Sequence, residues 1–149
     1  MVSTYATDKS FKFSIVSLER NIYSGDVRTI SATSVAGELG VYPQHAPLLA
    51  KLAPGVVHIV DIDGDEDYIY VSGGYIEVQP SNVIILADTA IRGQEVDEAA
   101  AREAKRRAEE GIQTSILYSD RDRAYAEMVK ALAQLKALEK SRRRKKRGM

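Results

Sequence analysis

The strongest constraint on the fold is a change of sequence pattern at residue 93. All four prolines and eight of the ten glycines lie within residues 1–93 and divide that part into short segments. Apolar and polar residues alternate within these segments, as in "FKFSIVSLE" at 11–19, and "DIDGDED" carries an Asp-Gly hairpin signal at Gly64. Short alternating segments at spacings near ten residues are typical of a β-sandwich or flattened barrel.

The residues that follow Gly93 contain no proline and have the periodicity of helices. The run "VDEAAAREAKRRAEEG" predicts a first helix, with Asp97 as its N-cap and Gly111 at its end. Its expected inner face is a stripe of three alanines, at positions 100, 104 and 108. Such a stripe buries little apolar area, so we expect packing to hold this helix only weakly.

A second helix is predicted from Asp120 to about Lys146, roughly 40 Å long at 1.5 Å per residue. Ser119 and Asp122 have the spacing of an N-terminal capping pair. The expected packed face consists of apolar residues at helical spacing, namely Tyr125, Met128, Val129, Leu132, Leu135 and Leu138. The predicted fold class is therefore α+β, with a flattened β-sandwich of short, mostly antiparallel strands in residues 1–93 and a two-helix hairpin in residues 94–149.

Charge is divided between the same two parts, although the net charge is zero. Residues 1–93 hold six basic and eleven acidic side chains, whereas residues 94–149 hold fifteen basic and ten acidic ones. The basic excess culminates in "KSRRRKKR", with seven basic residues in eight. A split of this kind indicates two tasks. Steeply salt-dependent binding to DNA or RNA would be one alternative use of the basic end.

The composition is that of a soluble globular protein, and it excludes several kinds of chemistry. There is no cysteine, which removes disulfides, cysteine zinc sites and thiol nucleophiles. No run reaches the roughly 18 apolar residues that a membrane span needs, and the first ten residues lack the blocks of a secretory signal. These features are those expected of a protein in a reducing cytoplasm.

Histidine, metal and phosphate chemistry are equally poorly supported. His45 and His58 have neither a G-x-S-x-G elbow nor an H-x-x-x-H spacing beside them, so we expect no triad and no zinc. In "DIDGDED" the glycine does not fall where a calcium loop needs it. "SGGY" at 72–75 is not a phosphate-binding loop. We therefore predict no catalytic residue and no metal; a ligand-binding sandwich remains a further alternative.

Four stretches of the sequence are long and unusual, and they occur in a characteristic order. They are "YSGDV" at 23–27, "GELGVYPQHAPLLAKLAPG" at 37–55, "YVSGGYIEVQPSNVIILADTAIRG" at 70–93 and "AQLKALE" at 133–139. Together they resemble the epsilon subunit of the bacterial F-type ATP synthase, over about residues 11–139. The resemblance implies a β-sandwich followed by a helical hairpin, which agrees with the periodicity.

The resemblance also implies a role and partners. It implies a non-catalytic rotor subunit of a proton- or ion-translocating synthase, bound to the gamma subunit and touching the ring of c subunits. Its place would be peripheral, on the cytoplasmic face of the bacterial inner membrane. The expected contact residues are Glu38, Val41, Tyr42 and His45, on a loop that prolines and glycines stiffen.

The predicted second helix is expected to inhibit ATP hydrolysis by reaching the alpha and beta subunits. The basic side chains expected to make those contacts are Arg121, Arg123, Lys130, Lys136, Arg142, Arg143 and Arg144. Members of the family that bind ATP well carry an aliphatic-Asp-x-x-Arg run at the first helix. Here Asp97 and Arg107 match that site, but Ala100 stands where its arginine would be. No cofactor is expected beyond weak, regulatory ATP.

Overall fold

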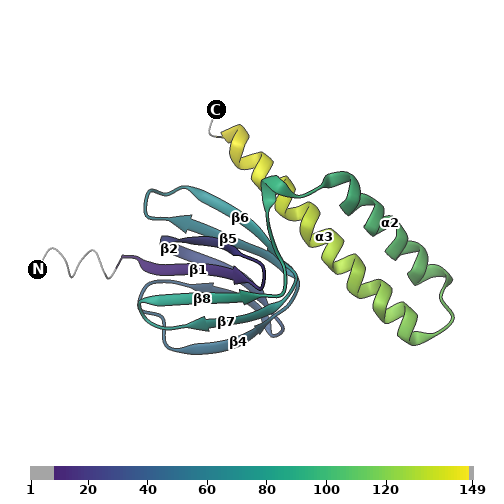
Figure 1. Cartoon of the computed structure of the whole chain (residues 1–149), viewed down its shortest axis with the longest axis horizontal. Coiled ribbons are helices and arrows are strands. Elements are labelled where there is room, and N and C mark those ends of the chain that lie inside the picture. The colour runs from purple at the N-terminus through teal and green to yellow at the C-terminus, as the bar shows by residue number, and fades with distance from the viewer. Residues whose placement is uncertain (1–8, 148–149) are drawn as a thin grey trace, which may run out of the picture.

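The computed structural model describes residues 9–147 and consists of a β-sandwich with a helical hairpin against one end (Figure 1). Nine strands are followed by a short 3-10 helix and two α-helices. The strands are β1 (Phe11–Ser17), β2 (Asn21–Ser34), β3 (Gly37–Val41), β4 (Leu48–Leu52), β5 (Gly55–Asp61), β6 (Glu66–Val71), β7 (Gly74–Val78), β8 (Asn82–Ala87) and β9 (Ala90–Arg92). The helical elements are η1 (Gly93–Glu95), α2 (Glu98–Thr114) and α3 (Tyr118–Arg147).

The long strand β2 joins the two layers of the sandwich. The hydrogen-bonded order is β1-β8-β7-β4-β2-β5-β6-β9, with β3 paired to β2 and β1 also paired to β2. The pairing of β1 with β8 is parallel and the other pairings are antiparallel. The prediction of a flattened sandwich of mostly antiparallel strands, followed by two helices, is confirmed.

Large aliphatic and aromatic side chains fill the space between the layers. Phe11, Phe13 and Ile15 alternate along β1 and all three are buried, as the period of two predicted. The turn between β5 and β6 is the predicted hairpin, and Gly64 has the positive φ of 87° that favours glycine there. Gly74 has a φ of 128°, and a Cβ at that position would lie 2.0 Å from the Leu86 carbonyl oxygen. No other residue fits there.

Helix α2 begins where the sequence predicted but continues further. Asp97 is its N-cap, and the side chain of Asp97 accepts a hydrogen bond from the Ala100 backbone N–H at 3.1 Å. The prediction that Gly111 ends the helix is wrong, because the helix continues to Thr114. A Cβ at Gly111 would lie 3.0 Å from the Ala124 Cβ, so this glycine serves a close approach of α3. The buried alanines are Ala101 and Ala108, rather than the predicted 100–104–108 stripe.

Helix α3 packs only partly through the residues predicted: Leu138 is buried and Leu135 packs beside it, as expected. It begins at Tyr118, so Ser119 lies inside the first turn and the predicted capping pair is wrong. Tyr125, Val129 and Leu132 are exposed, whereas the residues buried on this helix are mostly small: Ala131, Ala133, Ala137, Leu138 and Ser141. The reason is that α3 contacts two neighbours on two faces, α2 and the sandwich, and small side chains allow both approaches.

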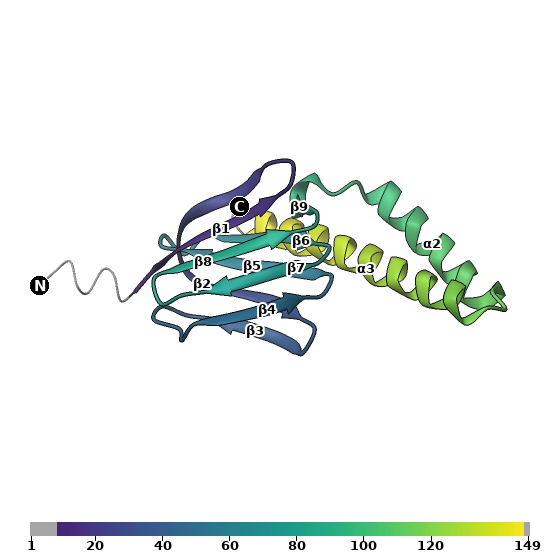
Figure 2. The ribbon, with the colours of Figure 1, turned by 60° about the horizontal axis from the view of Figure 1, so that its bottom comes forward.

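The hairpin lies docked on the sandwich, which the sequence left undetermined. Figure 2 shows the N-terminal part of α3 beyond the strands, beside α2, and its C-terminal part alongside the strands. Ala133 and Ala137 pack against Tyr70 of β6, with Val56 and Ile91 beside them. Leu138 packs against Val96 and Ala101, which joins the hairpin to the segment that follows β9. Of the helices within residues 9–147, none combines the length and the apolar character that crossing a membrane requires.

Candidate functional site

The connection between β3 and β4, residues 42–47, forms one end of the sandwich. The Gln44 backbone N–H donates to the Pro80 carbonyl oxygen at 3.0 Å, which ties this connection to the turn between β7 and β8. Figure 2 places it at the end away from the helices. Tyr42 is 64% exposed, and the His45 side chain is half-buried with its Nδ1 2.7 Å from the Ala46 carbonyl oxygen. The connection therefore presents an aromatic ring and an imidazole on a backbone held by hydrogen bonds.

Glu38 lies towards the other end of β3, near the turn with β2. Its side chain is exposed and accepts a hydrogen bond from the Thr33 hydroxyl at 2.7 Å. It lines an open cleft together with His58 of β5 and Lys136 of α3. The structure therefore does not bring Glu38 and His45 to one point, because Glu38 is the second residue of a strand and His45 lies beyond its end.

One predicted contact residue is buried. Val41 is 0% exposed and pairs across the sheet with Ile30 of β2, so its side chain belongs to the core. The prediction that Val41 meets a partner is wrong for this side chain. The physical reason is the alternation along β3, which turns successive side chains to opposite faces and sends Val41 inward while its neighbour Tyr42 stays outside. Val41 anchors the connection instead.

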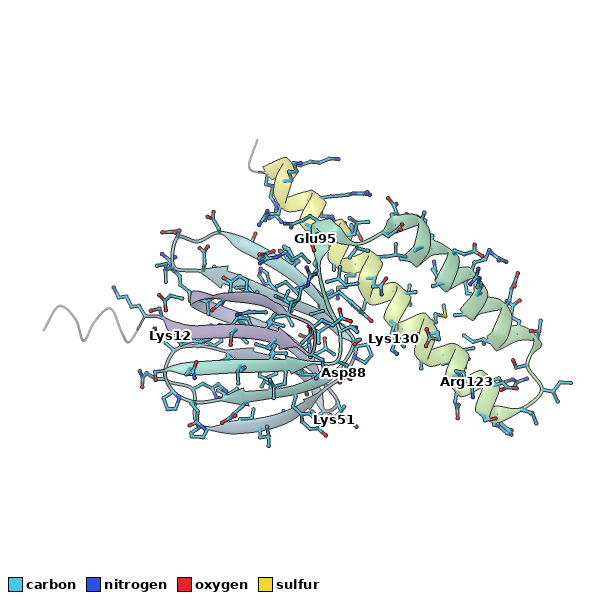
Figure 3. The ribbon with its side chains drawn as sticks, in the orientation of Figure 1. Lys12, Lys51, Asp88, Glu95, Arg123 and Lys130 are labelled. Carbon is cyan, nitrogen blue, oxygen red and sulfur yellow. The ribbon has the colours of Figure 1, made fainter. Side chains whose placement is uncertain are left out.

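A second candidate site lies between the two helices of the hairpin. Arg107 of α2 and Arg123 of α3 line a cleft of about 360 Å³, with three alanines beneath them; Figure 3 marks Arg123. Asp120 and Glu127 line the same cleft, and Arg107 Nε is already 3.2 Å from the Glu103 carboxylate. The carboxylates oppose the binding of a polyphosphate here, because like charges repel.

The structure does not bring Asp97 and Arg107 together. Ten residues of helix separate them, which corresponds to roughly 15 Å along the axis. The Asp97 carboxylate is occupied by its capping bond, and Ala100 is exposed and carries no charge. Arg123 was not part of the predicted nucleotide site. Its position in the cleft follows from the pairing of the two helices, which the sequence pattern of either helix does not show.

Several of the basic residues of α3 are engaged within the chain in this docked conformation. Arg142 Nη2 is 2.8 Å from the Glu98 carboxylate and so links α3 to the first turn of α2. The hydrogen bond from Arg142, followed by that from Arg102, holds the pKa of the Glu98 carboxyl below its usual range. Four of the other predicted residues bond to nearby groups: Arg121 to the Ser115 carbonyl, Lys130 to Glu127, Arg143 to Glu139 and Arg144 to the Glu66 carbonyl. Arg123 and Lys136 line clefts.

The residues that permit docking were not among the predicted site residues. A Cβ at Gly93 would lie 2.0 Å from the Ser141 Oγ and 2.5 Å from the Ala137 carbonyl oxygen, so the chain crosses α3 in direct contact. Ser141 is buried, and its hydroxyl has no hydrogen-bond partner among the described residues. The spacing of Ala133, Ala137 and Ser141 by four residues was the available signal.

With this geometry established, comparison with known families is decisive. The family model for the ATP synthase delta/epsilon chain, beta-sandwich domain, matches residues 10–93, which include all nine strands. The chain belongs to this family. The prediction made from the four sequence stretches is confirmed at this level.

Two solved structures extend the likeness in fold beyond the sandwich. A chain in the cryo-EM structure of the Euglena gracilis mitochondrial ATP synthase, OSCP/F1/c-ring in rotational state 1, superposes with a TM-score of 0.76 at 21% identity. That match covers 89% of this delta/epsilon-family chain and 81% of the other. A chain of the Tetrahymena thermophila mitochondrial ATP synthase central stalk and c-ring gives 0.57 at 15% identity, covering 86% and 96%. At these sequence identities the two matches show a similar fold. The matched residues extend beyond the sandwich into the hairpin.

Proposed function

We propose that this chain is a non-catalytic rotor subunit of an F-type, proton- or ion-translocating ATP synthase. The observation that carries the proposal is the family match over residues 10–93, supported by a hairpin that packs on the sandwich. The two solved relatives belong to assemblies with a c-ring, and one is described as a central stalk. By analogy, this chain binds a gamma subunit and a c-ring, as a peripheral component on the cytoplasmic face of a bacterial inner membrane.

The end of the sandwich formed by residues 42–47 is the proposed attachment surface. Tyr42 and His45 project from a connection whose backbone is hydrogen-bonded to Pro80. Binding to a partner therefore costs little further conformational entropy of this backbone. Glu38, at the other end of β3, is an exposed carboxylate that contributes a separate contact. The core contains Val41 and supplies the rigidity beneath this surface.

The attachment is tested with the tagged chain in cells that express the synthase. We expect the tagged chain to co-purify with a membrane ATPase that contains gamma. The variant Glu38→Ala should fold normally, since exposed substitutions change stability by under about 0.5 kcal/mol, while coupling to the ring decreases. Lys12→Ala, an exposed change on β1, is the control. A Glu38→Ala chain that unfolds, or that couples as well as the control, would contradict this assignment.

We further propose that the hairpin inhibits ATP hydrolysis when it leaves the sandwich. At 30 residues, α3 spans roughly 45 Å, enough to extend towards the alpha and beta subunits. Deletion of residues 119–149 should leave a sandwich that still assembles, and ATP hydrolysis by the complex should rise. Arg142→Glu with Arg143→Glu should release part of the inhibition, less so at high salt. Unchanged hydrolysis in an assembled deletion variant would remove α3 from this role.

Nucleotide binding is proposed to be weak. The cleft between α2 and α3 offers Arg107 and Arg123 but also two carboxylates. Ala100, one helical turn before the cleft residue Ala104, supplies no guanidinium. Titration calorimetry should give ATP binding no tighter than about −4 kcal/mol, the millimolar regime. Ala100→Arg should strengthen binding, because a guanidinium adds a charge-assisted phosphate contact. Micromolar binding by the natural sequence would overturn this proposal.

A further inference from the structure

The turn between β5 and β6 concentrates negative charge in a fixed position. Five of the seven residues at 61–67, here named the acidic turn, are Asp or Glu. The Asp61 Oδ1 atom accepts hydrogen bonds from the backbone N–H groups of Asp63 and Asp65, both at 2.9 Å. These bonds hold the turn in one conformation, so its carboxylates form an ordered surface rather than a mobile loop.

The last turns of α3 lie against this acidic turn. Residues 140–147, here named the basic segment, carry seven cationic side chains. Arg144, Lys145 and Arg147 line one cleft together with Tyr23 and with four acidic residues, namely Asp61, Asp65, Glu66 and Asp67. Arg144 Nη1 donates to the Glu66 carbonyl oxygen, and Lys140 Nζ lies 5.7 Å from the centre of the Tyr68 ring.

Apolar packing alone provides little to hold α3 in this place. Directly on the sheet α3 presents the small side chains Ala133 and Ala137, and its larger Leu138 packs on Val96 after β9. The Ser141 hydroxyl is buried with no hydrogen-bond partner among the described residues. Alanine buries far less area than the Ile and Phe side chains of the core. Opposite charges that face each other across this cleft, by contrast, act through their summed field, since no ion pair joins the acidic turn to the basic segment among the described residues.

We propose that the acidic turn is an intramolecular docking site for the basic segment, and that this contact latches the hairpin onto the sandwich. The latch acts in the isolated chain and needs no partner subunit, so it goes beyond the proposed function. It has one further consequence. The basic segment cannot contact the acidic turn and a separate acidic surface at the same time, so any such surface competes with the latch.

The test measures hairpin docking in the purified full chain. The sequence has no cysteine, so Val35→Cys and Leu117→Cys, both exposed sites, accept a unique pair of spin labels. One variant reverses charges of the basic segment with Arg144→Glu and Arg147→Glu. A second variant reverses charges of the acidic turn with Asp65→Lys and Glu66→Lys. The third combines all four changes. The control, Lys12→Glu with Lys51→Glu, has the same charge change as the first variant, at exposed positions on the sandwich (Figure 3).

Each single-sided reversal should lower the ratio of docked to undocked chains by roughly threefold to tenfold at low salt. The combined variant should restore it, because opposite charges again face each other, and the control should not change it. In the natural sequence, raising the salt from low to about 0.5 M should lower the same ratio, since screening shortens the range of these contacts. The proposal is overturned if the reversals match the control, if the combined variant is not restored, or if salt has no effect.

Discussion

The core of the sandwich and the α3 face that packs on the sandwich are built from side chains of very different size. Between the two layers, eleven large side chains are almost completely buried, among them Phe13, Ile59 and Ile85. On α3, Ala133 and Ala137 pack on Tyr70, Leu138 packs on Val96, and Gly93 lets the crossing chain touch the helix. Because burial free energy scales with apolar area, the first region holds the fold and the second can be separated from it.

The largest expected effect lies in the core. Phe13→Ala removes a ring that is 1% exposed and packs 5.8 Å from the Tyr23 ring, so it should lower the free energy of unfolding by about 3–5 kcal/mol. Chemical denaturation followed by circular dichroism measures this change. Leu18→Ala, at a side chain that is 99% exposed, should stay within about 0.5 kcal/mol. Equal losses in both variants would mean that the core is not where the stability resides.

The second effect should separate the two regions. Gly93→Ala places a methyl group where the Ser141 Oγ and the Ala137 carbonyl already lie, so α3 must shift at a cost of about 1–3 kcal/mol. The hairpin should undock, as read by the spin-label distance. The denaturation midpoint of the sandwich should change less, because the third contact of the new methyl group, the Tyr68 carbonyl oxygen of β6, lies at a wider 3.0 Å. Gly40→Ala is the matched control, because its new methyl group would meet only the Tyr42 ring at an ordinary 3.7 Å. If the hairpin of Gly93→Ala stayed docked, the contact between Gly93 and α3 would have to leave room for a methyl group.

A smaller change should act in the opposite direction. Ser141→Ala removes a buried hydroxyl that has no partner among the described residues, so docking should strengthen by about 1 kcal/mol. The same spin-label pair measures it. Ser119→Ala, an exposed position in the first turn of α3, should leave docking unchanged. Weaker docking in Ser141→Ala would mean that the hydroxyl does form a hydrogen bond across the contact.

The smallest expected effect concerns pH and the link between α2 and α3. Arg142 lowers the pKa of Glu98 in the folded chain. The Arg142–Glu98 link therefore stabilises the docked hairpin at pH values above the unfolded pKa of Glu98, near 4.5, and this stabilisation is lost as the pH falls towards the lowered pKa. Acidification below about pH 4.5 should therefore loosen the hairpin. Carboxyl NMR titration should show the Glu98 pKa rising in Arg142→Gln, with Arg102 still holding part of the shift. An unchanged titration in that variant would exclude the link.

The sequence predicted the sandwich because its core residues follow a period of two and its turns carry Gly and Pro. It did not predict the inward position of Val41, because the short strand β3 was interpreted as a loop. The separation of Glu38 from His45 was missed for the same reason. The buried face of α3 was predicted only in part, since Leu138 is buried as expected but Tyr125, Val129 and Leu132 are exposed. Large apolar residues indicate a core face in most helices, but here two neighbours approach closely and most of the side chains that fit are small.

The most direct test of the difference between the two regions is hydrogen exchange of the intact chain, followed by mass spectrometry. Amides of the core strands β1, β5 and β8 should exchange only through global unfolding, whereas those of α2 and α3 should exchange through a separate, less costly opening. The predicted result is exchange in the hairpin that is on the order of a hundredfold faster than in these strands. Exchange of strands and helices at one common rate would contradict the account, because the hairpin would then be part of a single cooperative unit.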